Sequence, residues 1–276
     1  MSERTGIVRH TSASIRREAR HEAEQISQLL LGESVLILDA VDEGRWLKVQ
    51  GPDAYEGWLR SWHLQEGAPL EAGLWQVTSR WSHAYAEERE DSGILQDLSF
   101  GTRLPEADSL HQGFLPELMP RTGLHPWRLP GGQKVWTPRR HLAPLGSPGE
   151  GGVKALVRRG FRLLGIPYEW GGRSSSGMDC SGLQQLLFAS LGICLPRDSR
   201  LQVEGGEALN REDPGSWEAG DLLFFGEKAI DHVALYLGEG RILHASGEVR
   251  CEELTERGEL SGSGRSRLSA VRRLLS

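Results

Sequence analysis

The residue with the clearest chemical potential is Cys180, in the run Asp179-Cys180-Ser181-Gly182. Apolar residues at helical spacing predict a helix over residues 180–191, so the thiol stands in the first helical turn. Unpaired backbone N–H groups and the positive end of the helix dipole favour a thiolate there, and the thiolate is the nucleophilic form of cysteine. The same N–H groups can donate to an oxyanion. A buried, unreactive cysteine is the alternative, and Cys180 alone does not decide between the two.

Two histidines supply the context that Cys180 needs. The segment 231–246 predicts two strands joined by a short loop with two glycines. In this hairpin His232 lies opposite Ser246 and diagonal to His244, so the two imidazoles share one face about 7 Å apart. We expect this face to meet the helix that begins at Cys180. The other face is apolar and fixes the register, through Val233, Leu235, Leu237, Leu243 and Ala245.

A cysteine, a base and a group that orients the base form the arrangement of nucleophilic catalysis, with His232 as base and His244 as the orienting group. Paired histidines can instead bind a metal ion, for which Asp231 would be a further ligand. They can also be two hydrogen-bonded residues on a solvated sheet face. Spacing leaves these alternatives open; we favour the first and expect no metal and no cofactor.

Further motifs follow one another along the last part of the chain. They are Pro167-Tyr168-Glu169-Trp170-Gly171-Gly172, Met178-Asp179-Cys180-Ser181-Gly182, Gly220-Asp221-Leu222-Leu223-Phe224-Phe225, and then the two histidines twelve positions apart. In this order they resemble the NlpC/p60 cysteine peptidase domain. The resemblance implies a papain-like α+β core, Cys180 as nucleophile, His232 as general base, His244 as the polar third member and the Tyr168 hydroxyl as a donor at the oxyanion hole.

The segment 195–199 resembles one found in the γ-D-glutamyl-L-diamino acid endopeptidases of this family, which carry two bacterial SH3 domains before the peptidase domain. The resemblance implies that Asp198 receives the free amino group of an N-terminal L-Ala, and that Ser181 and Ser199 contact D-Glu. A carboxylate suits an ammonium group in a closed pocket. Arg197 and Trp170 are further candidates for substrate binding. Alternatively, Arg197 and Asp198 form a solvated salt bridge in a turn.

The same resemblance implies that the first SH3-like domain supplies an acid and an aromatic residue to the substrate pocket. Glu24 and Trp62 are the positions we nominate. Glu24 could equally cap a loop on the surface, and Trp62 stands where a tyrosine is expected.

Internal similarity and a linker divide the chain. Residues 29–35 are echoed by 98–104 and residues 57–64 by 135–142, at offsets of 69 and 78 positions. Short strands between turn residues predict all-β structure here, and the Gly- and Pro-rich stretch 144–152 predicts a linker. We therefore predict two small all-β SH3-like barrels over 1–72 and 73–148, and an α+β, papain-like peptidase domain over 149–276. Within the latter, helices are expected at 153–164 and 180–191, and strands at 221–225, 231–237, 241–246 and 269–274.

Composition excludes several classes of function. The 276 residues carry a formal net charge of −6, with basic residues scattered among acidic ones, which argues against a nucleic-acid partner. No apolar run approaches the roughly eighteen residues of a membrane span, and the first twenty residues hold no signal-peptide core, so we expect no membrane partner and a cytoplasmic location. Three cysteines without a CxxC pair indicate reduced thiols.

The sequence therefore predicts a cytoplasmic cysteine peptidase that cuts the bond between γ-D-Glu and L-Lys or diaminopimelate. Its expected substrates are free murein peptides with an unblocked N-terminal L-Ala, in the recycling of cell-wall peptides. Small murein peptides are the expected partners, and a monomer is the default. Two alternatives stay open: an amidase or acyltransferase on the same fold, and a non-catalytic protein that binds cell-wall peptides.

Overall fold

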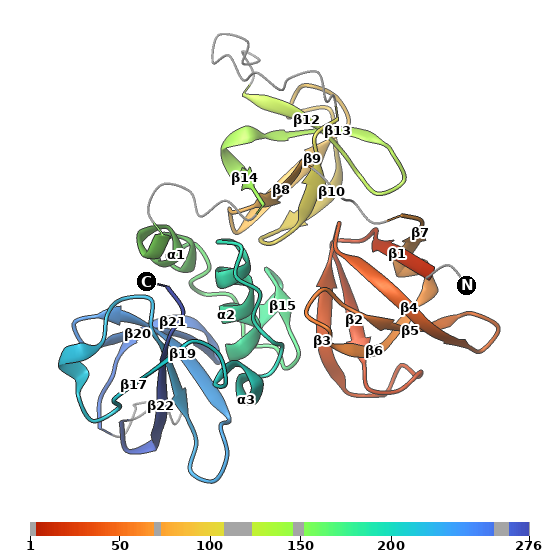
Figure 1. Cartoon of the computed structure of the whole chain (residues 1–276). Coiled ribbons are helices and arrows are strands. Elements are labelled where there is room, and N and C mark those ends of the chain that lie inside the picture. Colours follow the sequence, from red (N-terminus) through yellow and green to blue (C-terminus); the bar gives the residue numbers. More distant parts are fainter. Residues whose placement is uncertain (1–3, 69–72, 108–122, 146–151, 257–264, 276) are drawn as a thin grey trace. The chain divides into compact units, whose positions relative to one another are not determined.

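The computed structural model describes residues 4–68, 73–107, 123–145, 152–256 and 265–275. The chain divides into two units, Met1–Ser147 and Pro148–Ser276 (Figure 1). The division falls within the predicted linker, whose residues 146–151 lie outside the described residues, as do residues 69–72 beside the predicted boundary between the two SH3-like domains. None of the described helices is long and apolar enough to cross a membrane.

The first part of the first unit is a seven-stranded antiparallel sheet with the order β3-β2-β6-β5-β4-β1-β7. Apolar side chains of these strands form a buried core that includes Val35, Leu47 and Leu59. The strand order leaves β3 and β7 at the edges, so these described strands confirm the predicted all-β structure without closing into a complete barrel. The elements are β1 (Arg4–Val8), β2 (Ser12–Arg16), β3 (Gln25–Leu30), β4 (Ser34–Val41), β5 (Trp46–Gln50), β6 (Glu56–Arg60), the 3-10 helix η1 (Ser61–His63) and β7 (Leu64–Glu66).

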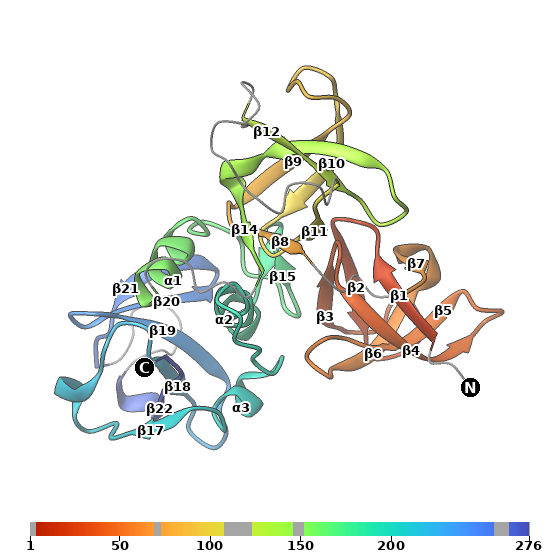
Figure 2. The same ribbon diagram turned by 45° about the horizontal axis from the view of Figure 1, so that its top comes forward.

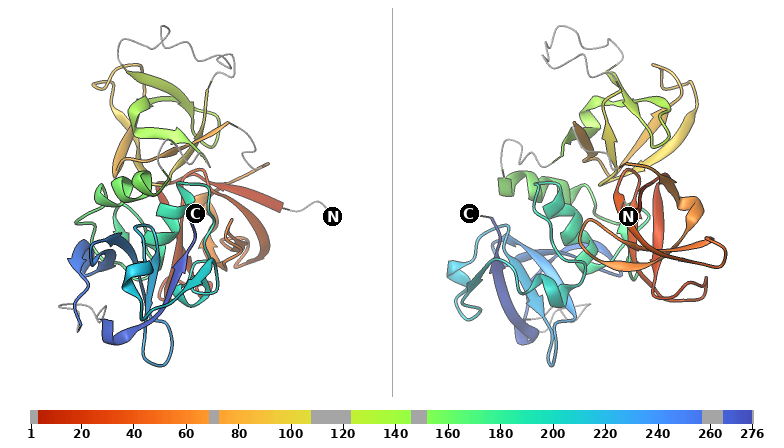
Figure 3. Two further views of the ribbon diagram at one scale, coloured as in Figure 1. Left: turned by 60° about the vertical axis from the view of Figure 1, so that its left-hand side comes forward. Right: turned by 45° about the vertical axis from the view of Figure 1, so that its right-hand side comes forward.

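The second part of this unit has the same element types in two smaller sheets, β10-β9-β13-β12 and β11-β8-β14 (Figure 3). Its core includes Leu98, Trp127 and Val135, together with Leu31 from the first part. The elements are β8 (Leu74–Val77), β9 (Trp81–Tyr85), β10 (Ile94–Ser99), β11 (Arg103–Pro105), β12 (Leu124–Arg128), β13 (Lys134–Pro138), the 3-10 helix η3 (Arg139–His141) and β14 (Leu142–Pro144).

The internal repeat read from the sequence is present in the backbone hydrogen bonds. Gly32 N donates to Val8 O at 2.9 Å, and 69 positions later Gly101 N donates to Val77 O at 2.9 Å. Both glycines have positive φ, +83° and +93°, a conformation that residues with a Cβ rarely adopt. At the other offset, the strand, 3-10 helix and strand from β6 to β7 recur from β13 to β14. The two repeats therefore share the same glycine turns, although few of their side chains are identical.

The second unit combines helices with a six-stranded antiparallel sheet of order β17-β22-β18-β19-β20-β21 (Figure 2). The α+β expectation is confirmed, although the first two predicted helices end two or three residues early. Strands β17 and β21 were not predicted. The elements are α1 (Gly152–Phe161), β15 (Arg173–Ser174), β16 (Gly177–Met178), α2 (Cys180–Ala189), α3 (Ser199–Gln202), β17 (Glu207–Leu209), the 3-10 helix η4 (Pro214–Ser216), β18 (Leu222–Phe225), β19 (His232–Gly238), β20 (Arg241–Ser246), β21 (Glu248–Glu253), the 3-10 helix η5 (Arg265–Arg267) and β22 (Leu268–Arg273).

The central hairpin β19–β20 has the predicted register, since Leu235 pairs with Leu243. Leu243 lies so close to α1 that a Cβ at Gly160 would stand 2.4 Å from its Cδ2 atom, so the helices cover the face with odd-numbered residues. The opposite face, which carries the histidines, continues into an apolar core with Ala234 and Ile242. Our expectation that the histidine face meets the start of the helix at Cys180 stays a prediction. Both faces of the hairpin are buried, and strand periodicity alone does not identify which face a helix covers.

Candidate active site

Cys180 is the first residue of α2, as predicted. Asp179 caps the helix: its Oδ1 atom accepts a hydrogen bond from Gly182 N at 2.7 Å. Cys180 is only 7% exposed, and almost every residue of α2 is buried. The first turn of this helix therefore lies inside the domain.

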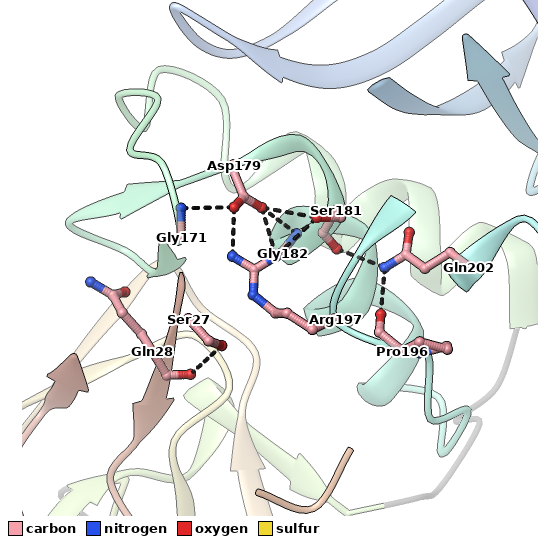
Figure 4. Close-up of polar contacts among 9 residues, drawn as sticks. All are labelled: Ser27, Gln28, Gly171, Asp179, Ser181, Gly182, Pro196, Arg197 and Gln202. Atoms are coloured by element: carbon pink, nitrogen blue, oxygen red, sulfur yellow. Dashed lines mark hydrogen bonds and ion pairs between the residues drawn. The ribbon is translucent and has the colours of Figure 1, made fainter. Parts of the chain in front are cut away.

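Asp179 also forms a buried ion pair with Arg197 (Figure 4). Arg197 donates through one amino group to Asp179 Oδ1 at 3.0 Å and to Ser181 Oγ at 2.9 Å, and through the other to Asp179 Oδ2 at 2.5 Å. Gly171 N donates to the same Oδ2 at 2.9 Å. Because Arg197 is 2% exposed, the alternative of a solvated salt bridge in a turn is wrong for this residue.

A buried glutamine holds the next predicted residues against the same turn of α2. Gln202 Nε2 donates to Ser181 O at 3.1 Å and to Pro196 O at 2.9 Å (Figure 4). The segment between Pro196 and Gln202 carries Asp198, which is half-buried, and Ser199, which is buried. The structure thus brings Ser181, Arg197, Asp198 and Ser199 into one neighbourhood beside Cys180.

The electrostatics of the thiol differ from the expectation. Burial, and then the negative charge of Asp179, raise the pKa of Cys180 to about 12, against the opposing effects of the backbone amides of Val233 and Ser181 and of Arg197. These effects oppose the predicted resting thiolate and favour the protonated thiol in the substrate-free protein. The physical reason is that burial and the carboxylate that caps the helix outweigh the positive helix end.

The two predicted histidines hydrogen-bond directly to each other. His232 Nε2 and His244 Nδ1 are 2.8 Å apart, and the rings are nearly perpendicular at 83°. His232 is 8% and His244 0% exposed, so the solvated-face alternative is wrong. Burial lowers the pKa of His232 to about 3, with further lowering by His244, Arg267 and Arg250. Burial also lowers the pKa of His244. Both rings are neutral at pH 7 and able to take up a proton.

A cavity of about 300 Å³ lies beside His232. It is lined by Tyr168, Asp231, His232, Ala245, Ser246, Gly247 and Arg267. Asp231 Oδ2 accepts from Arg267 at 2.5 Å, so the wall carries one residue of each charge. Burial raises the pKa of Tyr168 to about 12, with further raising by the neighbouring Cys180 and Asp179. Its hydroxyl therefore stays protonated and can donate a hydrogen bond beside the thiol.

The remaining predicted residues lie in more open positions. Trp170 is 63% exposed in the loop before α2. In the first unit, Glu24 accepts from Arg17 at 2.8 Å, and Trp62 is 50% exposed with the Arg60 guanidinium 4.1 Å from its ring centroid. The part of Glu24 and Trp62 in a substrate pocket stays a prediction.

Glu252, which we did not predict as a site residue, has its Oε1 atom 3.2 Å from His244 Nε2. The signal was present: Gly247 makes a turn after β20, and Val249 and Cys251 alternate with polar residues as in a strand. A strand there places Glu252 opposite Ile242 and diagonal to His244, which is the pairing observed. The partnership between Arg197 and Asp179 was also missed.

Comparisons with known proteins show what this chain is similar to. A sequence model of the NlpC/P60 family matches residues 165–260, and one described as the bacterial dipeptidyl-peptidase Sh3 domain matches residues 15–64. The chain is similar to a gamma-D-glutamyl-L-lysine dipeptidyl-peptidase of Bacillus cereus, with 31% identity over 249 residues that cover 83% of this chain and 69% of the relative. The enzyme of the same name from Bacillus subtilis is 29% identical over 231 residues, 79% of this chain and 71% of the relative.

A solved structure shows the same fold. The crystal structure of an NlpC/P60 family protein from Bacillus cereus superposes with a TM-score of 0.77 and 22% identity, over 99% of this chain and 100% of that chain.

Proposed function

The chain belongs to the NlpC/P60 family of cysteine peptidases, and we propose that it hydrolyses the γ-D-glutamyl bond to the diamino acid of short murein peptides with a free N-terminal L-alanine. The observation that carries the proposal is the pairing of His232 and His244 at 2.8 Å in a chain whose relatives over most of its length are named for that reaction. A role in the recycling of cell-wall peptides in the cytoplasm belongs to the same proposal.

In the proposed reaction Cys180 attacks the γ-carbonyl carbon of D-Glu and gives its proton to His232. The carbon–sulfur bond forms, and the carbonyl electron pair moves onto oxygen, which accepts from backbone N–H groups at the start of α2 and from the Tyr168 hydroxyl. His232 then protonates the departing amine as the carbon–nitrogen bond breaks. Water, deprotonated by His232, cleaves the thioester, and the thiol regains its proton.

The pKa values describe when the first proton moves. The thiol has a pKa of about 12 and His232 one of about 3, so a separate thiolate and imidazolium are disfavoured before substrate arrives. The proton transfer is therefore expected to accompany formation of the carbon–sulfur bond. The amide of Val233, which contacts the Cys180 sulfur, stands next to His232 and keeps the thiol at the beginning of β19.

Substrate recognition is proposed on both sides of the scissile bond. Asp198 binds the ammonium group of L-Ala, and Ser181 and Ser199 contact D-Glu, while Arg197 holds Asp179 and Ser181 in place. Trp170 covers the peptide.

The leaving diamino acid is proposed to enter the cavity beside His232. Its ammonium and carboxylate groups match the opposite charges of Asp231 and Arg267, which line that cavity. Because this ion pair is already complete in the substrate-free protein, binding requires Arg267 to exchange one carboxylate for another.

The test compares L-Ala-γ-D-Glu-L-Lys with its N-acetylated form, with products identified by mass spectrometry. We expect L-Ala-D-Glu and free L-Lys from the first peptide only, and no product with Cys180→Ala. Asp198→Asn is expected to raise KM for the free peptide and leave the acetylated one uncut. Equal cleavage of both peptides contradicts the role of Asp198, and cleavage of neither contradicts the proposed function.

A further inference from the structure

Glu252 stands at the end of a line of buried side chains that begins at the proposed base. His232 Nε2 lies 2.8 Å from His244 Nδ1, and His244 Nε2 lies 3.2 Å from Glu252 Oε1. The line crosses three neighbouring strands, β19, β20 and β21. The Glu252 side chain is 14% exposed and that of His244 is fully buried, so solvent screens this contact little.

We propose that Glu252 is a positioning residue that fixes the tautomers of both histidines and so makes Nδ1 of His232 the base. An ionised carboxylate has no proton to donate, so its negative charge 3.2 Å from Nε2 favours the proton of neutral His244 on that atom. His244 Nδ1 is then an acceptor, and the atom that faces it, His232 Nε2, carries a proton. The lone pair of neutral His232 is left on Nδ1. The inference rests on the proposed peptidase role of this pair.

The negative charge of Glu252 has a second effect, on the protonation of the two histidines. Arg250 and Arg267 both disfavour a proton on His232, and Arg250 also disfavours one on His244. Asp231 is mostly exposed and paired with Arg267. Glu252 is the group whose negative charge favours protonation of His244, and it also lies 3.4 Å from Arg250 Nε. It therefore offsets the arginines when His232 accepts the thiol proton.

The pairing of β21 with β20 sets the position of Glu252. β21 pairs with β20 so that His244 faces Arg250 and Ile242 faces Glu252, which puts the carboxylate one diagonal step from the imidazole. Glu253, the next residue, pairs with Arg241 and is exposed. Because successive residues of a strand point to opposite faces, Glu253 serves as a matched control for Glu252.

The experiment records the imidazole ¹⁵N resonances of the full chain, assigned with His232→Gln and His244→Gln. In the native protein we expect both histidines to carry their proton on Nε2. In Glu252→Leu a second tautomer should appear, and kcat on L-Ala-γ-D-Glu-L-Lys should fall at least about tenfold, the effect of one pKa unit on a base. Glu252→Gln keeps an acceptor but loses the charge, so it should lower the apparent pKa of the pair. Glu253→Gln should match the native protein in all three respects.

Two results would overturn the inference. One is a proton on Nδ1 of His232 in the native protein. The other is an unchanged apparent pKa in Glu252→Gln, which decides the matter even where Glu252→Leu fails to fold. A native protein that cuts no peptide overturns the proposed function, whereas the resonances still report the tautomers, so the two failures are distinguishable.

Discussion

The two sides of the candidate site stabilise their buried polar groups in opposite ways. At the start of α2, Asp179 and Arg197 are both charged, and the carboxylate accepts hydrogen bonds from Arg197, from the backbone and from Ser181. Across the sheet, His232 and His244 are neutral and hydrogen-bond chiefly to each other. The difference separates two tasks. A fully paired ion network holds the nucleophile in place, while a neutral pair keeps the capacity to accept a proton.

The largest expected effect comes from breaking the charged side. Arg197→Met leaves the Asp179 carboxylate buried without its cation, so we expect the free energy of unfolding to fall by about 3–5 kcal/mol. Denaturant unfolding of the full chain measures it, with hydrogen exchange of the α2 amides to locate the change. Arg200→Met, exposed in α3, is the matched control.

A double variant tests whether this loss of stability comes from the unpaired charge of Asp179. Asp179→Asn combined with Arg197→Met removes both charges and keeps a residue that caps helices well, so part of the lost stability should return. A loss for Arg197→Met no greater than that for Arg200→Met would contradict the scaffold role of the ion pair.

The neutral side should respond in activity more than in stability. His244→Leu removes the partner of His232, so kcat is expected to fall about 10²-fold or more. The free energy of unfolding should fall by only about 1–3 kcal/mol, because one neutral donor loses its acceptor. Steady-state kinetics and denaturant unfolding measure the two quantities, with Glu248→Gln, exposed on β21, as control. If His244→Leu lost as much stability as Arg197→Met and retained kcat, the two sides would not differ in their tasks.

Acid should destabilise the neutral side. The pKa of His232 is about 3 in the folded chain, below the value of about 6.5 in an unfolded one. Between these values the unfolded state binds more protons, so this contribution is complete above pH 6.5 and is lost as pH falls toward 3.

The size of the effect follows from linkage. At pH 5 His232 should cost about 2 kcal/mol of the free energy of unfolding, at about 1.4 kcal/mol per pH unit. The measurement compares the native protein with His232→Gln at pH 7 and pH 5, so that the other buried histidines cancel. Parallel pH curves for the two proteins would mean that His232 is not held neutral by burial.

Much of this site follows from local sequence, and the rest does not, for physical reasons. Strand alternation set the register of β19 and β20 and so the meeting of His232 with His244, and the helix start placed Cys180. The protonation state of the thiol depends on burial, which is a property of the whole domain. Arg197 lies 18 positions after its partner Asp179, and no periodicity connects them. Contacts of this kind, between separate elements, cannot be predicted from the periodicity of a single sequence.

The two SH3-like repeats offer a second comparison, between a histidine Nδ1 atom with a hydrogen-bond partner and one that, in the described part of the chain, has none. In the second repeat, His141 Nδ1 is 2.9 Å from Ser82 Oγ. The corresponding histidine of the first repeat is His63, and the residue that corresponds to Ser82 is Ala13. Among the described residues His63 Nδ1 has no hydrogen-bond partner, and burial lowers the pKa of this histidine to about 4. A single missing hydroxyl accounts for the difference.

The smallest expected effect restores that hydroxyl. Ala13→Ser should raise the free energy of unfolding of the first unit by about 0.5–1.5 kcal/mol, the net value of a hydrogen bond. The reciprocal change Ser82→Ala should lower it by about 1–3 kcal/mol, because Nδ1 of His141 then loses the hydroxyl of Ser82. Denaturant unfolding of the full chain measures both. Ala13 is fully buried, so an introduced hydroxyl that misses His63 would itself be an unpaired polar group. Destabilisation by Ala13→Ser would therefore mean that the repeats share their backbone but not the geometry around this histidine.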